Sequence, residues 1–287
     1  MFQDAELVKV LSTKFVPVAI DQHIHRQRKD EEGDLFAKVL KQAGRGLDGY
    51  SQGVYLFTPD GKLLAFANTA DAAGVKRLTD VALKKFDPKA PPIKLDDIKA
   101  APVLPPPPDG GLILDVTAKV LGGYDPDDPK TKRFRESLGR DHLWLRKDEA
   151  EALAKGTLLK SVAERLVRYH LLDNTRGEPP MWRVDEIKKL DMTLKDGRLT
   201  GAVHLETKAG DRGYQADFWG IVDTKDGQVA RLDVLAKGQF WGEGSFTRGA
   251  PKGRFPFAVA FALADVDCAT SKVPPQAARG NLKAYLK

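Results

Sequence analysis

Two connections in the second half of the chain carry the residue types best suited to bind a ligand. One reads Asp-Asn-Thr-Arg-Gly-Glu-Pro-Pro-Met-Trp-Arg over residues 173–183, and the other, over residues 238–254, is rich in glycine. Aromatic rings stack on flat ligands, and guanidinium and ammonium groups hold anions. The candidate ligand-binding residues are therefore Trp182, Arg183, Phe240, Trp241, Glu243, Arg248, Lys252 and Arg254. The alternative is that the glycines form tight turns and the aromatic rings close one end of a sheet.

The same two connections also allow an enzymatic alternative. It needs an acid or base, an imidazole partner and a guanidinium that stabilises an anion. The residues available for these three roles are Glu178 or Glu243, His142 or His170, and Arg248 or Arg254. The chain contains no Gly-x-Ser-x-Gly, no His-Glu-x-x-His and no Gly-x-x-x-x-Gly-Lys motif, so the common hydrolase and nucleotide-dependent classes have no support. The sequence predicts no cofactor.

A histidine pair near the start of the chain is the candidate metal site. His23 and His25 are two residues apart, and in an extended segment both imidazoles would point the same way. They could then bind Zn²⁺ or Cu²⁺, with Asp21 or Asp30 completing the ligand set. The alternative is two solvated histidines in a charged turn.

Cysteine content and net charge limit the functional classes that the protein can belong to. The only cysteine, Cys268, excludes an intramolecular disulfide. It lies near Asp265 and Asp267, which would raise its pKa, so we expect an unreactive thiol. The net charge of +6 gives no clear sign of nucleic-acid binding, and a protein partner or a small anionic ligand is the better expectation.

No apolar run approaches the roughly 20 residues that span a bilayer, so we expect no transmembrane segment. We expect a soluble protein, exported only if a leader has been removed.

The elements that must position these residues fall into two regions. Four consecutive prolines at 105–108 cannot continue a helix or a sheet ladder, and further prolines precede them. The sequence therefore predicts a first domain at 1–87, a proline-rich linker at 88–110 and a second domain at 111–287. The overall class is α+β.

In the first domain, apolar spacing predicts a helix after Asp4, a short buried strand over 15–20 and a second helix around 35–40. The runs 54–57 and 63–66 flank Thr-Pro-Asp-Gly-Lys, which predicts a hairpin. A last helix is expected over 75–86.

This order of elements resembles the thioredoxin superfamily. The resemblance rests on Phe-Gln-Asp at 2–4, Phe-Val-Pro-Val-Ala-Ile-Asp at 15–21 and Gly-Val-Tyr-Leu-Phe-Thr-Pro-Asp-Gly-Lys-Leu-Leu at 53–64. It implies a truncated thioredoxin-like α/β domain. The family's Cys-x-x-Cys pair is missing, and Ser-Gln-Gly stands where its cis-proline would precede the strand at 54. Dithiol exchange needs two thiols, so the resemblance implies a redox-inactive scaffold.

The second domain shows antiparallel features. Residues 112–120 alternate in polarity, and four strand-like runs at 190–194, 199–207, 214–222 and 229–237 are separated by glycine-containing turns. They predict a β-meander, followed by a final strand over 255–263. A helix over 148–171 is expected to cover one face of the sheet.

The sequence thus favours a non-catalytic binding or interaction protein. Its redox-inactive thioredoxin-like module would dock a partner, and its α+β domain would recognise a ligand. Two alternatives stay open: an enzyme with its site between the Trp182 and Trp241 connections, and a thiol-redox protein whose cysteines lie upstream of residue 1.

Overall fold

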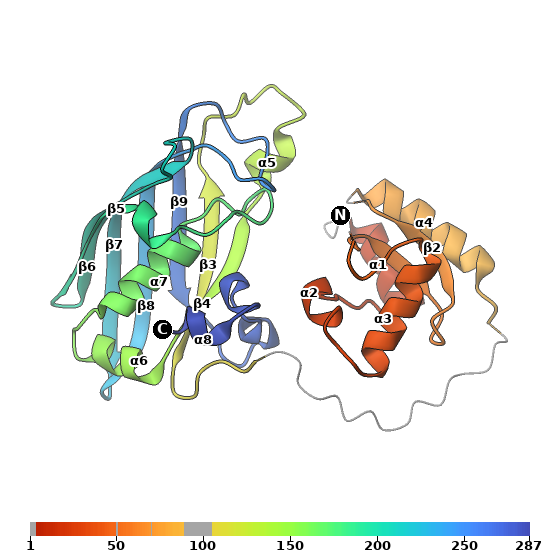
Figure 1. Ribbon diagram of the computed structural model, residues 1–287, viewed down its shortest axis with the longest axis horizontal. Helices are drawn as coiled ribbons and strands as arrows, with labels where there is room; N and C mark the ends of the chain where they lie inside the picture. Colours follow the sequence, from red (N-terminus) through yellow and green to blue (C-terminus); the bar gives the residue numbers. More distant parts are fainter. Residues whose placement is uncertain (1–3, 50, 70, 89–104) are drawn as a thin grey trace. The chain divides into compact units, whose positions relative to one another are not determined.

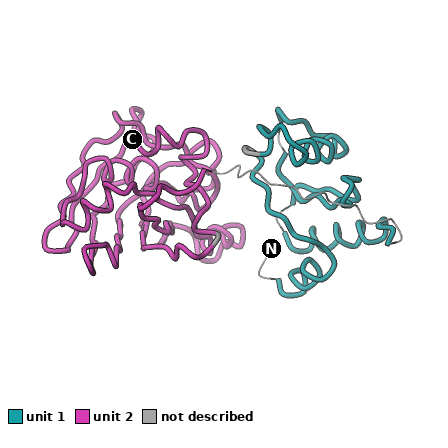
Figure 2. Tube along the Cα trace, turned by 90° about the horizontal axis from the view of Figure 1, so that it is seen from below, with its two compact units in different colours: residues 1–103 teal, residues 104–287 magenta. Residues whose placement is uncertain are grey.

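The computed structural model describes residues 4–49, 51–69, 71–88 and 105–287. The chain divides into two compact units, residues 1–103 and residues 104–287 (Figure 2). The division falls inside the predicted linker at 88–110, of which residues 89–104 lie outside the described residues. Both helices and antiparallel strands are present, which confirms the α+β class. Within the described ranges, no helix has the length and apolar character to cross a membrane.

The first unit is built from short helices around one hairpin (Figure 1). Its elements are α1 (Ala5–Lys14), α2 (Gln22–His25), α3 (Glu31–Gln42), β1 (Val54–Phe57), β2 (Leu63–Ala67) and α4 (Ala72–Lys85). Each longer helix begins at an aspartate whose side chain accepts an amide hydrogen bond from the first turn, such as Leu7 N to Asp4 Oδ1 at 2.9 Å. The apolar cluster of this unit joins Leu56 of β1 and Leu64 of β2, which pair antiparallel, to Leu78 and Ala82 of α4.

The strand predicted over 15–20 is wrong. Residues 16–20 form no described strand, and β1 and β2 pair with each other in a two-stranded sheet. Val16 is 88% exposed and Val18 is 71% exposed, so the segment is not buried. An apolar run becomes a buried strand only where a neighbouring strand completes its hydrogen bonds, and Pro17 has no amide hydrogen to donate. Local propensity therefore did not decide the structure here.

The second unit is organised around a seven-stranded antiparallel sheet (Figure 1). The strands lie in the order β4-β3-β9-β8-β7-β6-β5. Their bounds are β3 Leu112–Val120, β4 Gly139–Leu145, β5 Ile187–Lys195, β6 Arg198–Glu206, β7 Gly213–Lys225, β8 Gln228–Trp241 and β9 Arg254–Leu263. The four predicted runs correspond to β5 to β8, and each pairs with the next, so the β-meander is confirmed.

Two of its hairpins have Asp-Gly turns with both residues in the left-handed region. Asp196 and Gly197 have φ of 50° and 70°, and Asp226 and Gly227 have φ of 54° and 75°. Two-residue turns of this kind match the twist of the paired strands.

Two helices, not one, cover a face of this sheet. The predicted helix over 148–171 is divided into α6 (Lys147–Ala154) and α7 (Lys160–His170), because Gly156 adopts φ +76° after α6. Figure 1 shows both lying across the sheet, where α7 buries Val162, Leu166 and Val167. Smaller elements complete the unit: α5 (Lys132–Glu136), η1 (Val184–Glu186), η2 (Ala269–Lys272), η3 (Gln276–Ala278) and α8 (Leu282–Tyr285).

Candidate anion-binding pocket

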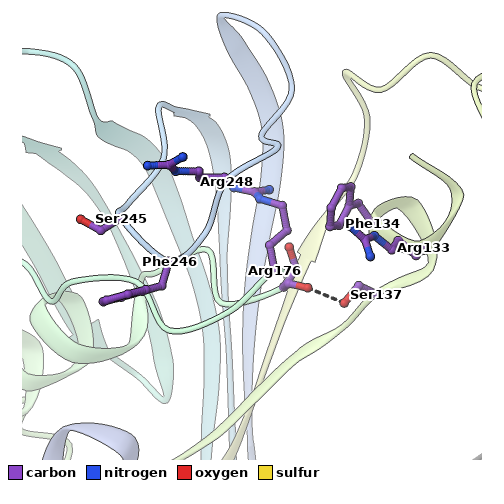
Figure 3. A pocket seen from close by; sticks show the side chains of 8 residues that line it. Arg133, Phe134, Ser137, Arg176, Ser245, Phe246 and Arg248 are labelled. Atoms are coloured by element: carbon purple, nitrogen blue, oxygen red, sulfur yellow. Dashed lines mark hydrogen bonds between the residues drawn. The ribbon is translucent and has the colours of Figure 1, made fainter. Parts of the chain in front are cut away.

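A pocket of about 490 Å³ lies in the second unit where three distant segments meet (Figure 3). The segments are α5 with the residues after it, the connection after α7, and the connection between β8 and β9. The lining residues are Arg133, Phe134, Ser137, Thr175, Arg176, Ser245, Phe246 and Arg248. A volume of this size suits a small organic ligand.

Sheet topology brings these segments together. Ala118, near the end of β3, pairs with Gly139 at the start of β4, and Val120 pairs with Phe257 near the start of β9. Trp241 at the end of β8 pairs with Arg254. The connections that precede β4 and β9 therefore lie at the same end of the sheet.

Direct contacts join the two connections that the sequence singled out. Arg176 Nε donates to the carbonyl oxygen of Thr247 at 3.0 Å. A Cβ added at Gly177, which has φ +157°, would lie 2.3 Å from the carbonyl oxygen of Phe246, so a larger residue would separate the two backbones. Ser137 Oγ donates to the carbonyl oxygen of Thr175 at 2.5 Å and ties in the segment after α5 (Figure 3).

Arg176 is the buried charge in the pocket wall. Its side chain is 1% exposed and pairs with the buried Asp173, with Nη1 2.7 Å from Oδ2. Nη1 also donates to Tyr124 Oη at 3.0 Å. The other terminal nitrogen, Nη2, is buried and has no hydrogen-bond partner among the described residues. A buried donor without a partner is costly, so an acceptor that reached Nη2 would be bound favourably.

Tyr124 connects the walls of the pocket. Its hydroxyl donates to the carbonyl oxygen of Gly249 at 3.0 Å, and its ring stacks on Phe134 with 6.1 Å between centroids. Burial raises the pKa of Tyr124, so the hydroxyl keeps its proton at neutral pH.

The pocket has an excess of positive charge. Arg133 and Arg248 form no ion pair with any residue that the structure describes, and the Arg133 guanidinium lies 4.6 Å from the centre of the Phe134 ring. Glu243, the nearest acidic residue in its connection, is turned to its own backbone. Its Oε2 accepts from Gly249 N at 2.8 Å and from Ala250 N at 3.1 Å. Glu243 therefore shapes the loop.

Of the eight predicted ligand-binding residues, Arg248 lines this pocket. Trp182 and Phe240 are core residues, 1% and 2% exposed, with 6.3 Å between ring centroids. They cannot stack on a ligand at the surface, which corrects that expectation. The error arose because β8 continues to Trp241, and strand alternation then turns Phe240 into the core.

The other predicted residues are engaged elsewhere or lie apart from the pocket. The Arg254 guanidinium covers the Trp241 ring at 3.9 Å and donates to Gln215 Oε1 at 2.7 Å. Arg183 is exposed at the start of η1, and Lys252 is exposed outside the pocket lining. Arg133, Phe134 and Arg176 line the pocket but are not among the residues predicted from the sequence. Two features of the sequence could have indicated them: the Arg-Phe-Arg run at 133–135, and the position of Arg176 within the 173–183 connection.

The residues of the enzymatic alternative take other partners. His142 Nε2 lies 3.4 Å from Asp115, and Glu178 pairs with Arg279 at 3.3 Å. His170 is buried, with Nδ1 3.1 Å from Asp141 Oδ2 and Nε2 2.8 Å from Tyr285 Oη. The structure thus pairs neither imidazole with Glu178 or Glu243.

The extended segment assumed for the histidine metal site is not observed. Residues 22–25 form the helix α2, so the alignment of residues two apart in an extended chain does not apply here. His25 Nδ1 is 3.0 Å from the carbonyl oxygen of Asp21, and Nε2 is 3.8 Å from Glu32. The described residues contain no group of three or more His, Cys, Asp or Glu side chains placed to hold a metal.

The pKa of the Cys268 thiol is lowered, whereas the sequence led us to expect a raised value. The hydroxyl of Thr270, 2.9 Å from Sγ, and the backbone amides of Thr270 and Ser271 lower the pKa of the thiol, and they outweigh the opposing charge of Asp265. The thiol is exposed.

No family model, curated protein or solved structure matches this chain.

Proposed function

We propose that the second unit binds a small anionic ligand in the pocket of Arg133, Arg176 and Arg248, and that the protein acts through binding and not catalysis. One observation carries the proposal: Nη2 of the buried Arg176 has no hydrogen-bond partner in the described residues of the pocket wall. Guanidinium groups form strong, directional bonds with carboxylate and phosphate oxygens. Arg133 and Arg248 add positive charge with no described carboxylate to neutralise it.

The first unit would serve as a thioredoxin-like docking module in this proposal. The order α1, α3, β1-β2 hairpin and α4 supports it, whereas the exposed 16–20 segment departs from it. The chain has no second cysteine for dithiol exchange.

Calorimetric titration of the full chain with inorganic phosphate tests the anion site. Arg133→Ala and Arg248→Ala should each weaken phosphate binding about ten- to a hundredfold, because a charge-assisted hydrogen bond contributes roughly 1.5–3 kcal/mol. Raising the salt concentration should weaken binding to the wild type and reduce the difference.

Lys252→Ala is the matched control, because Lys252 is a nearby exposed cation outside the pocket lining. It should leave phosphate affinity unchanged. Equal losses in all three variants would show only a general effect of net charge. That outcome, or no phosphate binding to the wild type, would exclude the proposed site.

A further inference from the structure

An exposed aromatic ring beside the arginines narrows the class of ligand. Phe246 is 67% exposed, although it lines the pocket between Ser245 and the segment that leads to Arg248. Phe134, which is half-buried, contributes a second ring from α5. Figure 3 shows Phe246 and Phe134 on opposite sides of the pocket, with Arg176 between them and Arg133 beside Phe134. Apolar and cationic groups are therefore combined in one cavity.

The backbone around Phe246 is held in place. Gly244 N donates to Thr247 Oγ1 at 2.7 Å, and Thr247 N donates to the carbonyl oxygen of Gly244 at 3.1 Å. Thr247 also accepts from Arg176, and Glu243 accepts two amides from the end of the loop. These hydrogen bonds hold the backbone around Phe246, so a bound group can cover the ring at little cost in ordering the backbone.

The charge of the pocket favours an anion with more than one negative charge. Three guanidinium groups line it, and Asp173 beneath Arg176 is the acidic residue that the structure pairs with them. A phosphate monoester carries about −1.5 to −2 charges at neutral pH and three acceptor oxygens. It can engage two arginines at once, which a monocarboxylate does less well.

We infer that the ligand is a phosphate monoester of a planar aromatic group, whose phosphate binds the arginines while its ring lies against Phe246. This inference rests on the proposed function, because it requires the anion site. Ring stacking is directional and favours a flat, polarisable partner over a flexible chain of similar size. The pocket volume of about 490 Å³ leaves room for a ring beside the phosphate.

Titration of the full chain with three probes tests the inference: inorganic phosphate, phenyl phosphate and butyl phosphate. Phenyl phosphate should bind about tenfold more tightly than inorganic phosphate, and butyl phosphate should gain less, because stacking adds to apolar contact. Phe246→Ala should remove most of the phenyl advantage and leave inorganic phosphate unchanged. Phe246→Leu keeps apolar volume without a ring, and should lower the affinity for phenyl phosphate to about that for butyl phosphate.

The two proposals fail in different ways. If inorganic phosphate binds through the arginines but phenyl and butyl phosphate bind equally, or Phe246→Ala leaves phenyl phosphate unaffected, the aromatic class is wrong and the anion site stands. If none of the three probes binds, both proposals are wrong. A change of fold in either Phe246 variant would appear in the far-ultraviolet circular dichroism, and the exposure of this side chain leads us to expect none.

Discussion

At the residue scale, the second unit depends on a buried ion pair between its two main helices. Glu149 in α6 and Arg165 in α7 are 0% and 2% exposed, with Arg165 Nη1 2.5 Å from Oε2 and Nη2 2.9 Å from Oε1. Arg165 also donates to the carbonyl oxygens of Tyr285 and Leu286 at 2.8 and 2.9 Å. One guanidinium therefore connects α6, α7 and the C-terminal segment.

Glu149→Ala should lower the free energy of unfolding by about 3–5 kcal/mol, because it leaves the Arg165 charge buried without its carboxylate. Urea denaturation followed by tryptophan fluorescence measures this unit alone, since all four tryptophans lie beyond residue 104. Glu164→Ala is the control: Glu164 pairs with the exposed Lys160, and its loss should cost less than about 1 kcal/mol. Similar losses in both variants would contradict the assigned role.

Acid should destabilise the same region. Burial tends to raise the pKa of Asp141, but the hydrogen bond and charge of His170 outweigh it and hold that pKa below its usual 3.8. Burial also tends to raise the pKa of Glu149. The hydrogen bonds from Arg165, Arg146 N and Ser161 outweigh it and hold that pKa below its usual 4.5. Because both pKa values are lower in the folded state, these carboxylates contribute stability above about pH 4.5, and this contribution is lost as pH falls through the lowered values.

The free energy of unfolding, measured by urea denaturation at a series of pH values, should therefore fall below about pH 4.5. Asp141→Asn removes one of the two groups and should flatten this dependence, even if it lowers stability at neutral pH. A variant with an unchanged slope would show that Asp141 is not among the responsible groups.

At the element scale, the close pairing of β7 and β8 depends on a glycine. A Cβ at Gly238 would lie 1.9 Å from the carbonyl oxygen of Gln215 and 2.6 Å from Cα of Ala216, both backbone atoms that cannot move without opening the ladder. Gly238→Ala should therefore cost more than about 2 kcal/mol of unfolding free energy. Gly280→Ala, where no heavy atom lies within 4 Å, should stay within about 0.5 kcal/mol. Equal effects would show that the sheet accommodates the methyl group.

At the scale of the whole molecule, the chain is two compact units with separate cores. The first has its apolar cluster between the β1-β2 hairpin and α4, and the second has a larger core between the sheet and α6 and α7. A separate core is the physical requirement for independent folding.

A fragment of residues 105–287 should therefore unfold at the same urea midpoint as the second unit in the full chain. The free energies of unfolding should agree within about 0.5 kcal/mol. Tryptophan fluorescence reports this transition in both proteins. The fragment should also keep the phosphate affinity of the full chain, because all lining residues of the pocket belong to it. A fragment that is unfolded or has lost binding would show that the first unit contributes to the second.

Predictions that depend on interactions between residues close in sequence agree with the structure, and those that depend on long-range pairing do not. The Asp-Gly turns and the alternation of strands fix the meander locally, and the sequence predicts β5 to β8 well. The first unit shows the opposite case, because the apolar run at 16–20 has strand propensity but pairs with no described strand. Phe240 illustrates a third case. It was predicted to contact a ligand, but β8 extends through it to Trp241 and its side chain lies in the core.

The sequence by itself determined the α+β class, the helix start at Asp4 and the hairpin turns, because each depends on residues a few positions apart. Tertiary structure decided the pocket. Arg133, Arg176 and Arg248 are separated by more than a hundred residues from first to last, and no local pattern relates them. Arg133 and Arg248 lie at one end of the sheet because β4 and β9, the strands that follow their connections, both pair antiparallel with β3. Arg176 is joined to the second of these connections by its hydrogen bond to Thr247. Long-range strand pairing thus created the proposed site.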